Sequence, residues 1–307
     1  MTDSVNPQAQ LYPPLTPLPV LLVGLLVAST SAIAVRFALA AGAAALLIAA
    51  FRLSLAALLL APYALARHRP DLTRLKRNDW LIALAAGGCL GLHFAAWISS
   101  LRYTSVAASV TLVTTAPLWV ALASRLFLGE RLSRPVLIGL PLALAGGVLI
   151  ALDGAGCAQG SACAQPLLGN LLALLGAIAY AGYLLLGRRL RASLSLAPYI
   201  FIVYSTGALA LLAVVALSHT PPNGAPEALV WIALLAVGPQ LIGHSSVNYA
   251  LRYLPATLVA IVTLGEPLGA SLLAFLLLHE LPGAAMWVGG ALILIGIASA
   301  TRQADRS

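Results

Sequence analysis

Residues 101–150 read LRYTSVAASVTLVTTAPLWVALASRLFLGERLSRPVLIGLPLALAGGVLI, and residues 251–300 read LRYLPATLVAIVTLGEPLGASLLAFLLLHELPGAAMWVGGALILIGIASA. The two stretches align without a gap at an offset of 150, and 13 of their 50 positions are identical. Leucine matches carry little weight in so apolar a chain, so the informative matches are those of other residue types. They include Arg102-Tyr103 with Arg252-Tyr253, Pro117 with Pro267, Glu130 with Glu280, Gly139 with Gly289 and Gly146 with Gly296. An internal repeat therefore organises the chain.

The composition places this repeat in a membrane. The chain has 307 residues, of which 61% are hydrophobic and 8% are charged, and its mean hydropathy is +0.98. A soluble core of this length needs neither so many apolar residues nor so few charges. We therefore predict an all-α integral membrane protein surrounded by the lipid bilayer. The net charge of +8 does not indicate a nucleic-acid partner, because the basic residues lie in short gaps between apolar runs.

Ten apolar segments are long enough to cross the ~30 Å hydrocarbon core as helices. They are 17–38, 41–64, 80–101, 104–128, 134–153, 167–187, 196–218, 227–250, 255–279 and 283–301. No Lys or Arg precedes the first segment, and it is longer than the apolar part of a signal peptide, so we interpret it as the first span. Five spans fall in each repeat, 17–153 and 167–301. Because five is odd, we predict two inverted five-helix repeats around a central cavity, a plan common among transporters.

The basic residues predict how the chain is oriented. Fourteen of them lie in loops, at span ends or in the C-terminal tail: Arg67, Arg69, Arg74, Lys76, Arg77, Arg102, Arg131, Arg134, Arg188, Arg189, Arg191, Arg252, Arg302 and Arg306. With ten transmembrane helices and the N-terminus inside, all of these except Arg102 fall on the cytoplasmic side. The positive-inside rule therefore predicts a multi-pass protein with both termini in the cytoplasm.

The repeat resembles a known family. Residues 102–150 look like the EamA module of the drug/metabolite transporter superfamily, and EPLGASLLAFLLLHELPGAAMWVGGALILIGI, residues 266–297, is similar to the second module of that family. AFRLSLAALLL at 50–60 and AIAYAGYLLLGRRL at 177–190 fit the same pattern. Within the family the chain most resembles the YddG-type amino acid exporters. The resemblance implies ten helices, a central cavity and export of small metabolites, foremost amino acids, across a bacterial inner membrane, by a monomer or homodimer without a cofactor.

Two polar faces recur at matching places in the third and eighth segments. At four-residue spacing, side chains share one face of a helix. The two sets are Cys89, His93 and Trp97, and Gln240, His244 and Asn248. Because a buried polar group must be hydrogen-bonded or wetted, we expect the two histidines, Trp97 and Asn248 to bind substrate in a wet cavity. The alternatives are structural histidines bonded to backbone, and a Trp97 that anchors the outer membrane interface.

Further candidates lie elsewhere in the spans. Trp119 and Tyr180 complete the predicted substrate-binding set. Glu266 is the carboxylate well inside a predicted span, so it is the candidate for proton coupling, the alternative being a packing role. The first repeat has TAPLW where the second has GEPLG, so Glu266 has no counterpart, and Pro267 after it can break the helix. Arg52 lies mid-span and needs a partner, which is an anionic substrate group, a carboxylate or helix-end carbonyls.

Other chemistry receives little support. HExxH, GxSxG and phosphate-binding glycine loops are absent from the sequence, so an intramembrane enzyme is the weaker alternative to an exporter of amino acids, amines, drugs or other metabolites. Cys157 and Cys163 share a loop that the predicted orientation places outside, and the sequence does not decide between a disulfide and two free thiols there. No histidine lies near enough to these cysteines for a metal site. We expect alternating access, by either facilitated diffusion or proton exchange.

Overall fold

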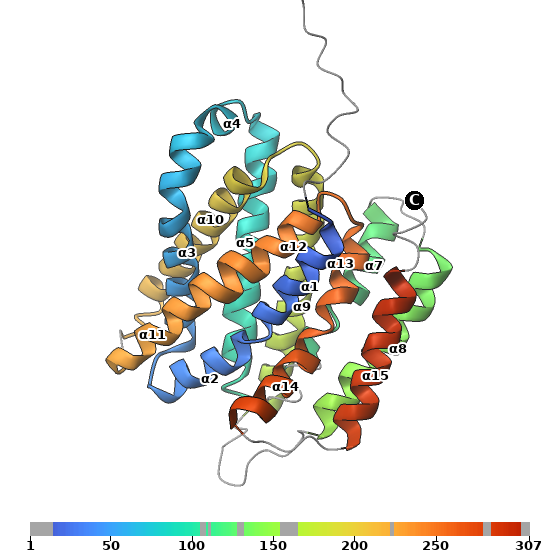
Figure 1. Cartoon of the computed structure of the whole chain (residues 1–307). Coiled ribbons are helices and arrows are strands. Elements are labelled where there is room, and N and C mark those ends of the chain that lie inside the picture. Colours follow the sequence, from blue (N-terminus) through green and yellow to red (C-terminus); the bar gives the residue numbers. More distant parts are fainter. Residues whose placement is uncertain are drawn as a thin grey trace, which may run out of the picture.

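The computed structural model describes residues 15–104, 109, 112–127, 132–153, 165–221, 224–278 and 284–301. The regular elements among these residues are all helices, and they form a bundle (Figure 1). In chain order they are α1 (Pro17–Ala28), α2 (Ser31–Ala40), α3 (Ala45–Arg67), α4 (Arg69–Thr73), α5 (Arg77–Ser100), α7 (Ala116–Phe127), α8 (Arg134–Asp153), α9 (Pro166–Arg191), α10 (Leu196–Leu217), α11 (Pro226–Leu235), the π-helix η2 (Ala236–His244), α12 (Ser245–Ala250), α13 (Ala256–Thr263), α14 (Glu266–Leu278) and α15 (Ala284–Thr301).

Six stretches of helix are long and apolar enough to cross a membrane. They are Pro17–Ala40, Ala45–Arg67, Arg77–Ser100, Leu167–Arg191, Leu196–Leu217 and Pro226–Ala250. Four shorter apolar helices lie in the remaining predicted segments: Ala116–Phe127, Arg134–Leu149, Ala256–Ala270 and Trp287–Ala300. The all-helical membrane class is confirmed by these helices, whereas the count of ten membrane crossings stays a prediction.

Helices of each half of the chain pack against helices of the other half. The predicted third span, α5, packs along α9, which opens the second half. Conversely, α11, η2 and α12 pack along α1 and α2, which open the first half. α3 packs on α10 and α8 packs on α15, so these two pairs join equivalent positions of the two halves. Each half therefore contributes to the packing of the other.

Glycines bring α8 and α15 into backbone contact. A Cβ built on Gly296 would lie 2.6 Å from the carbonyl oxygen of Gly139, and a Cβ built on Gly146 would collide with the carbonyl oxygen of Gly289. At the repeat offset of 150, Gly139 corresponds to Gly289 and Gly146 to Gly296, so one contact is the repeat image of the other. The two helices therefore cross antiparallel, at the close distance that small residues permit in membranes.

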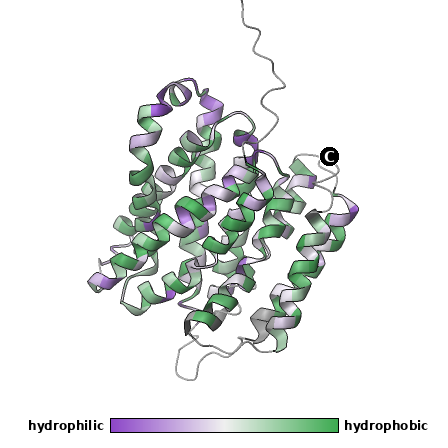
Figure 2. Ribbon diagram, in the orientation of Figure 1, coloured by the Kyte–Doolittle hydropathy of each residue, from purple (hydrophilic) through white to green (hydrophobic). Residues whose placement is uncertain are grey.

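Charged residues gather at one end of the bundle, which we call the charged end. α3 ends at Arg67, α5 begins at Arg77, α8 begins at Arg134 and α9 ends at Arg191. Figure 1 places these helix ends on one side of the molecule, and hydrophilic residues gather there in Figure 2. The opposite end carries fewer charges, as the sequence predicts.

A polar contact joins the two halves at the charged end. The connection from α3 to α5, predicted as a loop, contains the short helix α4. His68 Nδ1 lies 2.9 Å from Asp71 Oδ2, and this hydrogen bond lowers the pKa of the Asp71 carboxyl from its usual value. The Ser195 hydroxyl, immediately before α10, donates to the same carboxylate at 3.1 Å. The carboxylate form of Asp71 therefore holds α4 against the start of α10.

The glycine contact yields a stability prediction within one helix. In Gly146→Ala the new methyl group meets facing backbone, including the Ile293 nitrogen at 2.9 Å, whereas in Gly147→Ala the nearest atom is Thr114 Oγ1 at 3.8 Å. Gly146→Ala should destabilise the protein by about 1–3 kcal/mol, the usual cost of overpacking. Thermal unfolding in detergent should show a lower melting temperature for Gly146→Ala alone. Equal melting of the two variants would contradict the backbone contact.

Candidate functional site

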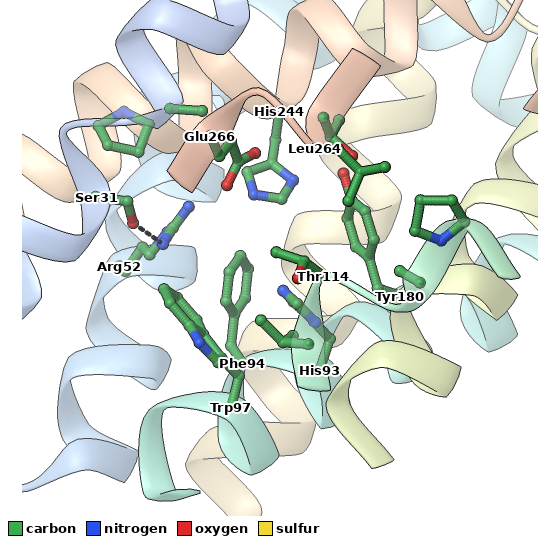
Figure 3. A pocket seen from close by; sticks show the side chains of 16 residues that line it. Ser31, Arg52, His93, Phe94, Trp97, Thr114, Tyr180, His244, Leu264 and Glu266 are labelled. Atoms are coloured by element: carbon green, nitrogen blue, oxygen red, sulfur yellow. Dashed lines mark hydrogen bonds between the residues drawn. The ribbon is translucent and has the colours of Figure 1, made fainter. Parts of the chain in front are cut away.

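A cavity of about 70 Å³ lies between helices of both halves (Figure 3). It is lined by Ala28, Ser31, Arg52, His93, Phe94, Trp97, Val113, Thr114, Ala116, Pro117, Tyr180, Pro239, His244, Thr263, Leu264 and Glu266. This volume holds several water molecules or one small polar group, and is below that of a pocket for a drug-sized ligand. The cavity of this structure therefore has room for a small polar group.

The backbone is irregular where helices reach this cavity. The interruptions are the turn between α1 and α2 at Ser29 and Thr30, the turn before α7 at Thr114 and Thr115, and the turn between α13 and α14 at Leu264 and Gly265. The last two occupy equivalent positions of the repeats. In addition, η2 is a π-helix that carries Pro239 and His244 to the cavity wall. Interrupted helices and π-helical turns are both associated with binding sites.

The break near Glu266 differs in detail from the sequence expectation. It lies at Leu264 and Gly265, before Glu266, rather than at Pro267. Proline is well tolerated in the first turn of a helix, because the amide it lacks has no partner there. Pro267 therefore belongs to the start of α14, and Glu266 becomes the first residue of that helix.

A threonine hydroxyl accompanies each of the three breaks. Thr30 Oγ1 donates to the Val27 carbonyl at 2.7 Å, Thr115 Oγ1 to the Leu112 carbonyl at 2.6 Å, and Thr263 Oγ1 to the Ala260 carbonyl at 2.8 Å. In every case the hydroxyl bonds the carbonyl three residues earlier, at the end of the preceding helix. Lipid offers such carbonyls no partner, so these side chains help the backbone to break inside a membrane.

Arg52 of α3 is the buried cation of the cavity wall. Its side chain is 1% exposed. Nε donates to Gln240 Oε1 at 2.9 Å, Nη1 donates to Ser31 Oγ at 3.1 Å, and Cζ lies 4.1 Å from the centroid of the Phe94 ring. A charged group inside a span is costly unless it has such partners. Side chains of α2, α5 and η2 therefore hold the guanidinium in place.

Glu266 supplies the negative charge of the wall. Figure 3 shows its carboxylate and the Arg52 guanidinium pointing toward one another. The two groups do not form a direct ion pair; the ion pair found in the described part of the chain joins His68 and Asp71. Glu266 stands at the N-terminus of α14, where the helix dipole favours negative charge. The cavity wall thus presents neighbouring opposite charges that do not touch.

The two histidines differ in their hydrogen bonds. His93 Nδ1 donates to the Gly176 carbonyl at 3.0 Å, so in the neutral ring Nε2 is the free acceptor. His244 Nδ1 is buried and has no hydrogen-bond partner among the described residues. The Phe94 ring lies beside both histidines, with centroid distances of 4.9 Å to His93 and 5.3 Å to His244.

Aromatic rings complete the wall around His93. The ring of Trp97 is stacked with it at 6.1 Å between centroids, and the Tyr180 ring lies at 4.8 Å. Trp97 Nε1 is buried without a hydrogen-bond partner in the described part of the protein. Unpartnered buried donors are costly, so this N–H and the His244 ring are available to a bound ligand or water.

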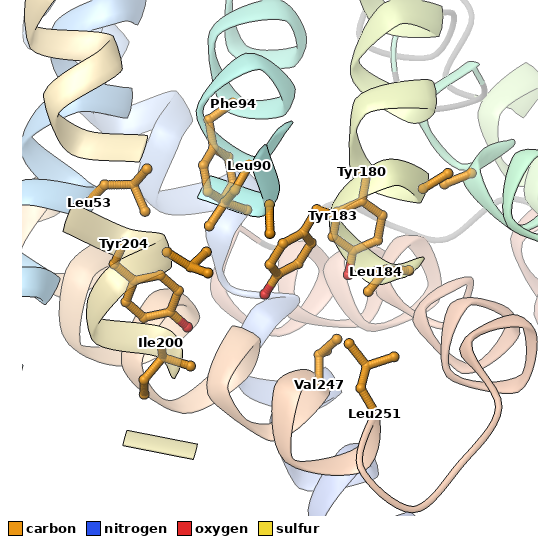
Figure 4. Close-up of a cluster of buried hydrophobic side chains, with 14 of the residues drawn as sticks. Leu53, Leu90, Phe94, Tyr180, Tyr183, Leu184, Ile200, Tyr204, Val247 and Leu251 are labelled. Carbon is orange, nitrogen blue, oxygen red and sulfur yellow. The ribbon is translucent and has the colours of Figure 1, made fainter. Parts of the chain in front are cut away.

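Part of the buried cluster drawn in Figure 4 forms a layer that we call the charged-end seal, and the helix bounds place it on the charged-end side of the cavity. It consists of Leu90, Tyr183, Leu184, Ile200, Tyr204, Val247 and Leu251, each at most 4% exposed. On α5, Leu90 lies nearer the charged end than His93, and on α9 Tyr183 lies nearer to it than Tyr180. Tyr204 donates to the Gln240 carbonyl at 3.2 Å. The cavity is therefore closed toward the charged end.

The residues predicted from sequence fall into two groups. Those that line the cavity are His93, Trp97, Tyr180, His244 and Glu266. Asn248 and Trp119 lie outside the wall: Asn248 is 0% exposed and accepts a hydrogen bond from the Tyr183 hydroxyl at 2.8 Å, and Trp119 Nε1 donates to Thr115 Oγ1 at 3.2 Å. Substrate binding by any of these residues stays a prediction. Glu130, Glu280, Cys157 and Cys163 lie outside the described residues.

Sequence reasoning did not assign several wall residues to the predicted substrate-binding set, although it singled out Arg52 as a cation that needs a partner. They are Ser31, Arg52, Phe94, Thr114 and Thr263. For Arg52 a signal was present, because an arginine far from either end of an apolar run requires an internal partner. Phe94 carries no comparable signal, since a phenylalanine in a membrane helix faces lipid as readily as a cavity.

The repeated helices and the polar cavity between them define a helical membrane protein of the transporter class. A model of the EamA-like transporter family matches residues 16–152 and 167–302, once in each half, and the chain belongs to this family. It is 27% identical over 235 residues to an "Uncharacterized transporter" of Archaeoglobus fulgidus, covering 76% of this chain and 78% of that protein. A solved structure titled "Crystal structure of protein" shares the fold, with a TM-score of 0.75, 24% identity, and coverage of 94% of this chain and 98% of that one.

These similarities confirm the coarser predictions. The family and the relative point to a membrane transporter rather than an enzyme. A transporter of this family implies a small-molecule substrate and a lipid environment. The two matched ranges also give the chain a two-repeat domain, as the internal alignment indicates.

His93 uses Nδ1 for a structural hydrogen bond and leaves Nε2 for a ligand, so a variant can test the two roles separately. The Asn amide nitrogen reaches the position of His Nδ1, so His93→Asn should keep the bond to the Gly176 carbonyl and lose only the packing of the ring. His93→Ala should lose about 1 kcal/mol of stability, the usual net value of such a bond, in addition to its lost packing. Thermal unfolding of both variants tests this order. A less stable His93→Asn than His93→Ala would refute the bond.

Proposed function

We propose that this transporter exports small metabolites, foremost amino acids, from a bacterial cytoplasm by alternating access, in the manner of the YddG-type exporters. The observation that carries the proposal is the cavity itself. Charged, aromatic and titratable side chains converge where helices of both halves are interrupted. Such a wall suits a small molecule with polar and apolar parts.

The proposed architecture is ten spans in two inverted five-helix repeats, 17–153 and 167–301, with both termini in the cytoplasm. Its support is the pair of glycine contacts that are repeat images of one another, and the exchange of packing partners between the halves. Both are what a two-fold axis in the membrane plane would produce. The gathering of basic residues at one end supports assigning that end to the cytoplasm.

Alternating access would operate on the charged-end seal. With the charged end in the cytoplasm, the structure corresponds to a state closed toward the cytoplasm. Export then requires the seal around Tyr183 and Tyr204 to open while the opposite side closes. Tyr183 and Tyr204 hydrogen-bond to Asn248 and to the Gln240 carbonyl, so these bonds would exchange during the cycle.

In this proposal His93, Trp97, Tyr180 and His244 contact the substrate in the described state. Asn248 and Trp119 lie behind the wall, so contact of either with substrate belongs to the other state. Glu266 is the proposed proton-coupling group, because its carboxylate faces the cavity within a membrane-spanning region. If protons are exchanged for substrate, a pH gradient across the vesicle membrane should stimulate transport, whereas facilitated diffusion should not respond to it.

Counterflow in proteoliposomes tests the proposal. Vesicles loaded with a mixture of unlabelled amino acids should accumulate labelled amino acid when they contain the protein, because exchange requires no external energy. His93→Asn should reconstitute normally yet exchange about tenfold more slowly, the effect of losing one hydrogen bond to substrate. Imposing a pH gradient on parent and Glu266→Gln vesicles measures coupling.

The outcomes separate the parts of the proposal. Stimulation by the gradient in the parent but not in Glu266→Gln supports proton exchange, and no stimulation in either supports facilitated diffusion. Full exchange by His93→Asn removes that ring from the substrate site. Absence of amino acid exchange by a folded, reconstituted protein contradicts the amino acid assignment and directs the assay to amines and drugs.

A further inference from the structure

The arrangement of Arg52 and Glu266 carries an inference about what the cavity recognises. Two of the five guanidinium N–H groups of Arg52 are engaged, by Gln240 and Ser31. The others have no hydrogen-bond partner among the described residues. The Glu266 carboxylate, which points toward them in Figure 3, does not close a direct ion pair with Arg52. Both charges therefore retain unused hydrogen-bonding capacity toward the cavity.

When Glu266 is ionised, the formal charges of the wall sum to zero. With neutral histidines and an ionised Glu266, Arg52 and Glu266 carry the formal charges among the described cavity-lining residues. A cation or an anion that enters such a site adds an unbalanced charge in a region of low polarity, which is costly. A zwitterion adds no net charge and offers each wall group an opposite charge. The site therefore favours a neutral molecule that carries both signs.

The spacing of the two groups fits one kind of zwitterion. Because Arg52 and Glu266 are neighbours on the wall, the ligand charges must also be close together, as they are when ammonium and carboxylate share one carbon atom. The cavity of about 70 Å³ is of head-group size. The Phe94, Trp97 and Tyr180 rings beside it offer apolar surface to a side chain.

We propose that Arg52 and Glu266 form a head-group site for α-amino acids, in which Arg52 binds the carboxylate and Glu266 binds the ammonium group. This inference rests on the proposed function, since it names the head group by which an amino acid cargo is selected. Guanidinium–carboxylate hydrogen bonds are directional and strong, so the two contacts also fix the orientation of the ligand. Molecules that lack either charge leave a wall group unpaired.

Binding of matched compounds to the purified protein tests the site apart from transport. Each triad contains an amino acid, its decarboxylated amine and its deaminated acid: leucine, 3-methylbutylamine and 4-methylpentanoate; alanine, ethylamine and propionate; phenylalanine, phenethylamine and 3-phenylpropionate. Calorimetric titration or ligand-induced thermal stabilisation should show, in at least one triad, binding of the amino acid about tenfold or more tighter than either fragment. Equal binding of all members in every triad, or no binding at all, overturns the inference.

Removing one wall charge should change the preferred charge of the ligand. Glu266→Gln keeps the shape of the side chain and leaves a net positive wall, so it should bind the deaminated acid better than the amino acid. Arg52→Gln should instead favour the amine. Glu227→Gln and Arg125→Gln make the same replacements outside the cavity wall and should keep the parent preference. If Arg52→Gln does not fold, the isosteric Glu266→Gln still decides, and an unchanged amino acid preference in that variant refutes the site.

Binding and counterflow fail in distinguishable ways. Amino acid exchange in vesicles without discrimination between amino acids and their fragments leaves the proposed function standing and overturns the head-group site. Selective amino acid binding without exchange supports the site and contradicts transport of that amino acid. Loss of selectivity in the two control variants would also refute the inference, because neither residue lines the cavity.

Discussion

The absence of water in the bilayer core is the constraint on which the rest of this structure depends. Every backbone amide and carbonyl there must bond within the protein, so an interrupted helix is tolerated only where other groups replace its lost bonds. Three helix breaks and a π-helical segment meet at one cavity, and each break carries a threonine hydroxyl bonded to the preceding helix end. The polar groups of the interior therefore allow the helices to break, and the broken helices in turn expose polar backbone to the cavity.

Symmetry and asymmetry have separate roles in the bundle. The frame follows the repeat, since the glycine contacts between α8 and α15 are images of one another and the first and third spans of each half pack on those of the other half. The cavity does not follow it, because Arg52 and Glu266 are single charges and η2 has no π-helical counterpart in α5. A duplicated scaffold thus positions a site whose chemistry is specific to this chain.

Much of the frame could be predicted from sequence, because apolar length and repeated Pro, Gly and Glu positions report directly on membrane helices. Four-residue spacing correctly predicted that His93 and Trp97 lie on one wall. The position of Arg52 in the middle of an apolar run likewise indicated that it must have a partner inside the protein. The spacing did not reveal which helix faces meet. Asn248 shares a face with His244 but lies one α-helical turn nearer the charged end, where it bonds to Tyr183 of the seal. Four-residue spacing gives the face of a helix, but not how far along the helix the cavity extends.

The exchange of packing partners between the halves has a consequence for how the chain is made. α1 packs on η2 and α12, which follow it by more than 200 residues, and α5 packs on α9, the first helix of the second half. During synthesis the early helices enter the membrane before their permanent neighbours exist, and their small-residue surfaces face lipid or temporary partners. The permanent packing of α1 and α8 therefore forms only after helices of the second half have been made, and α8 then meets α15 through the paired glycines.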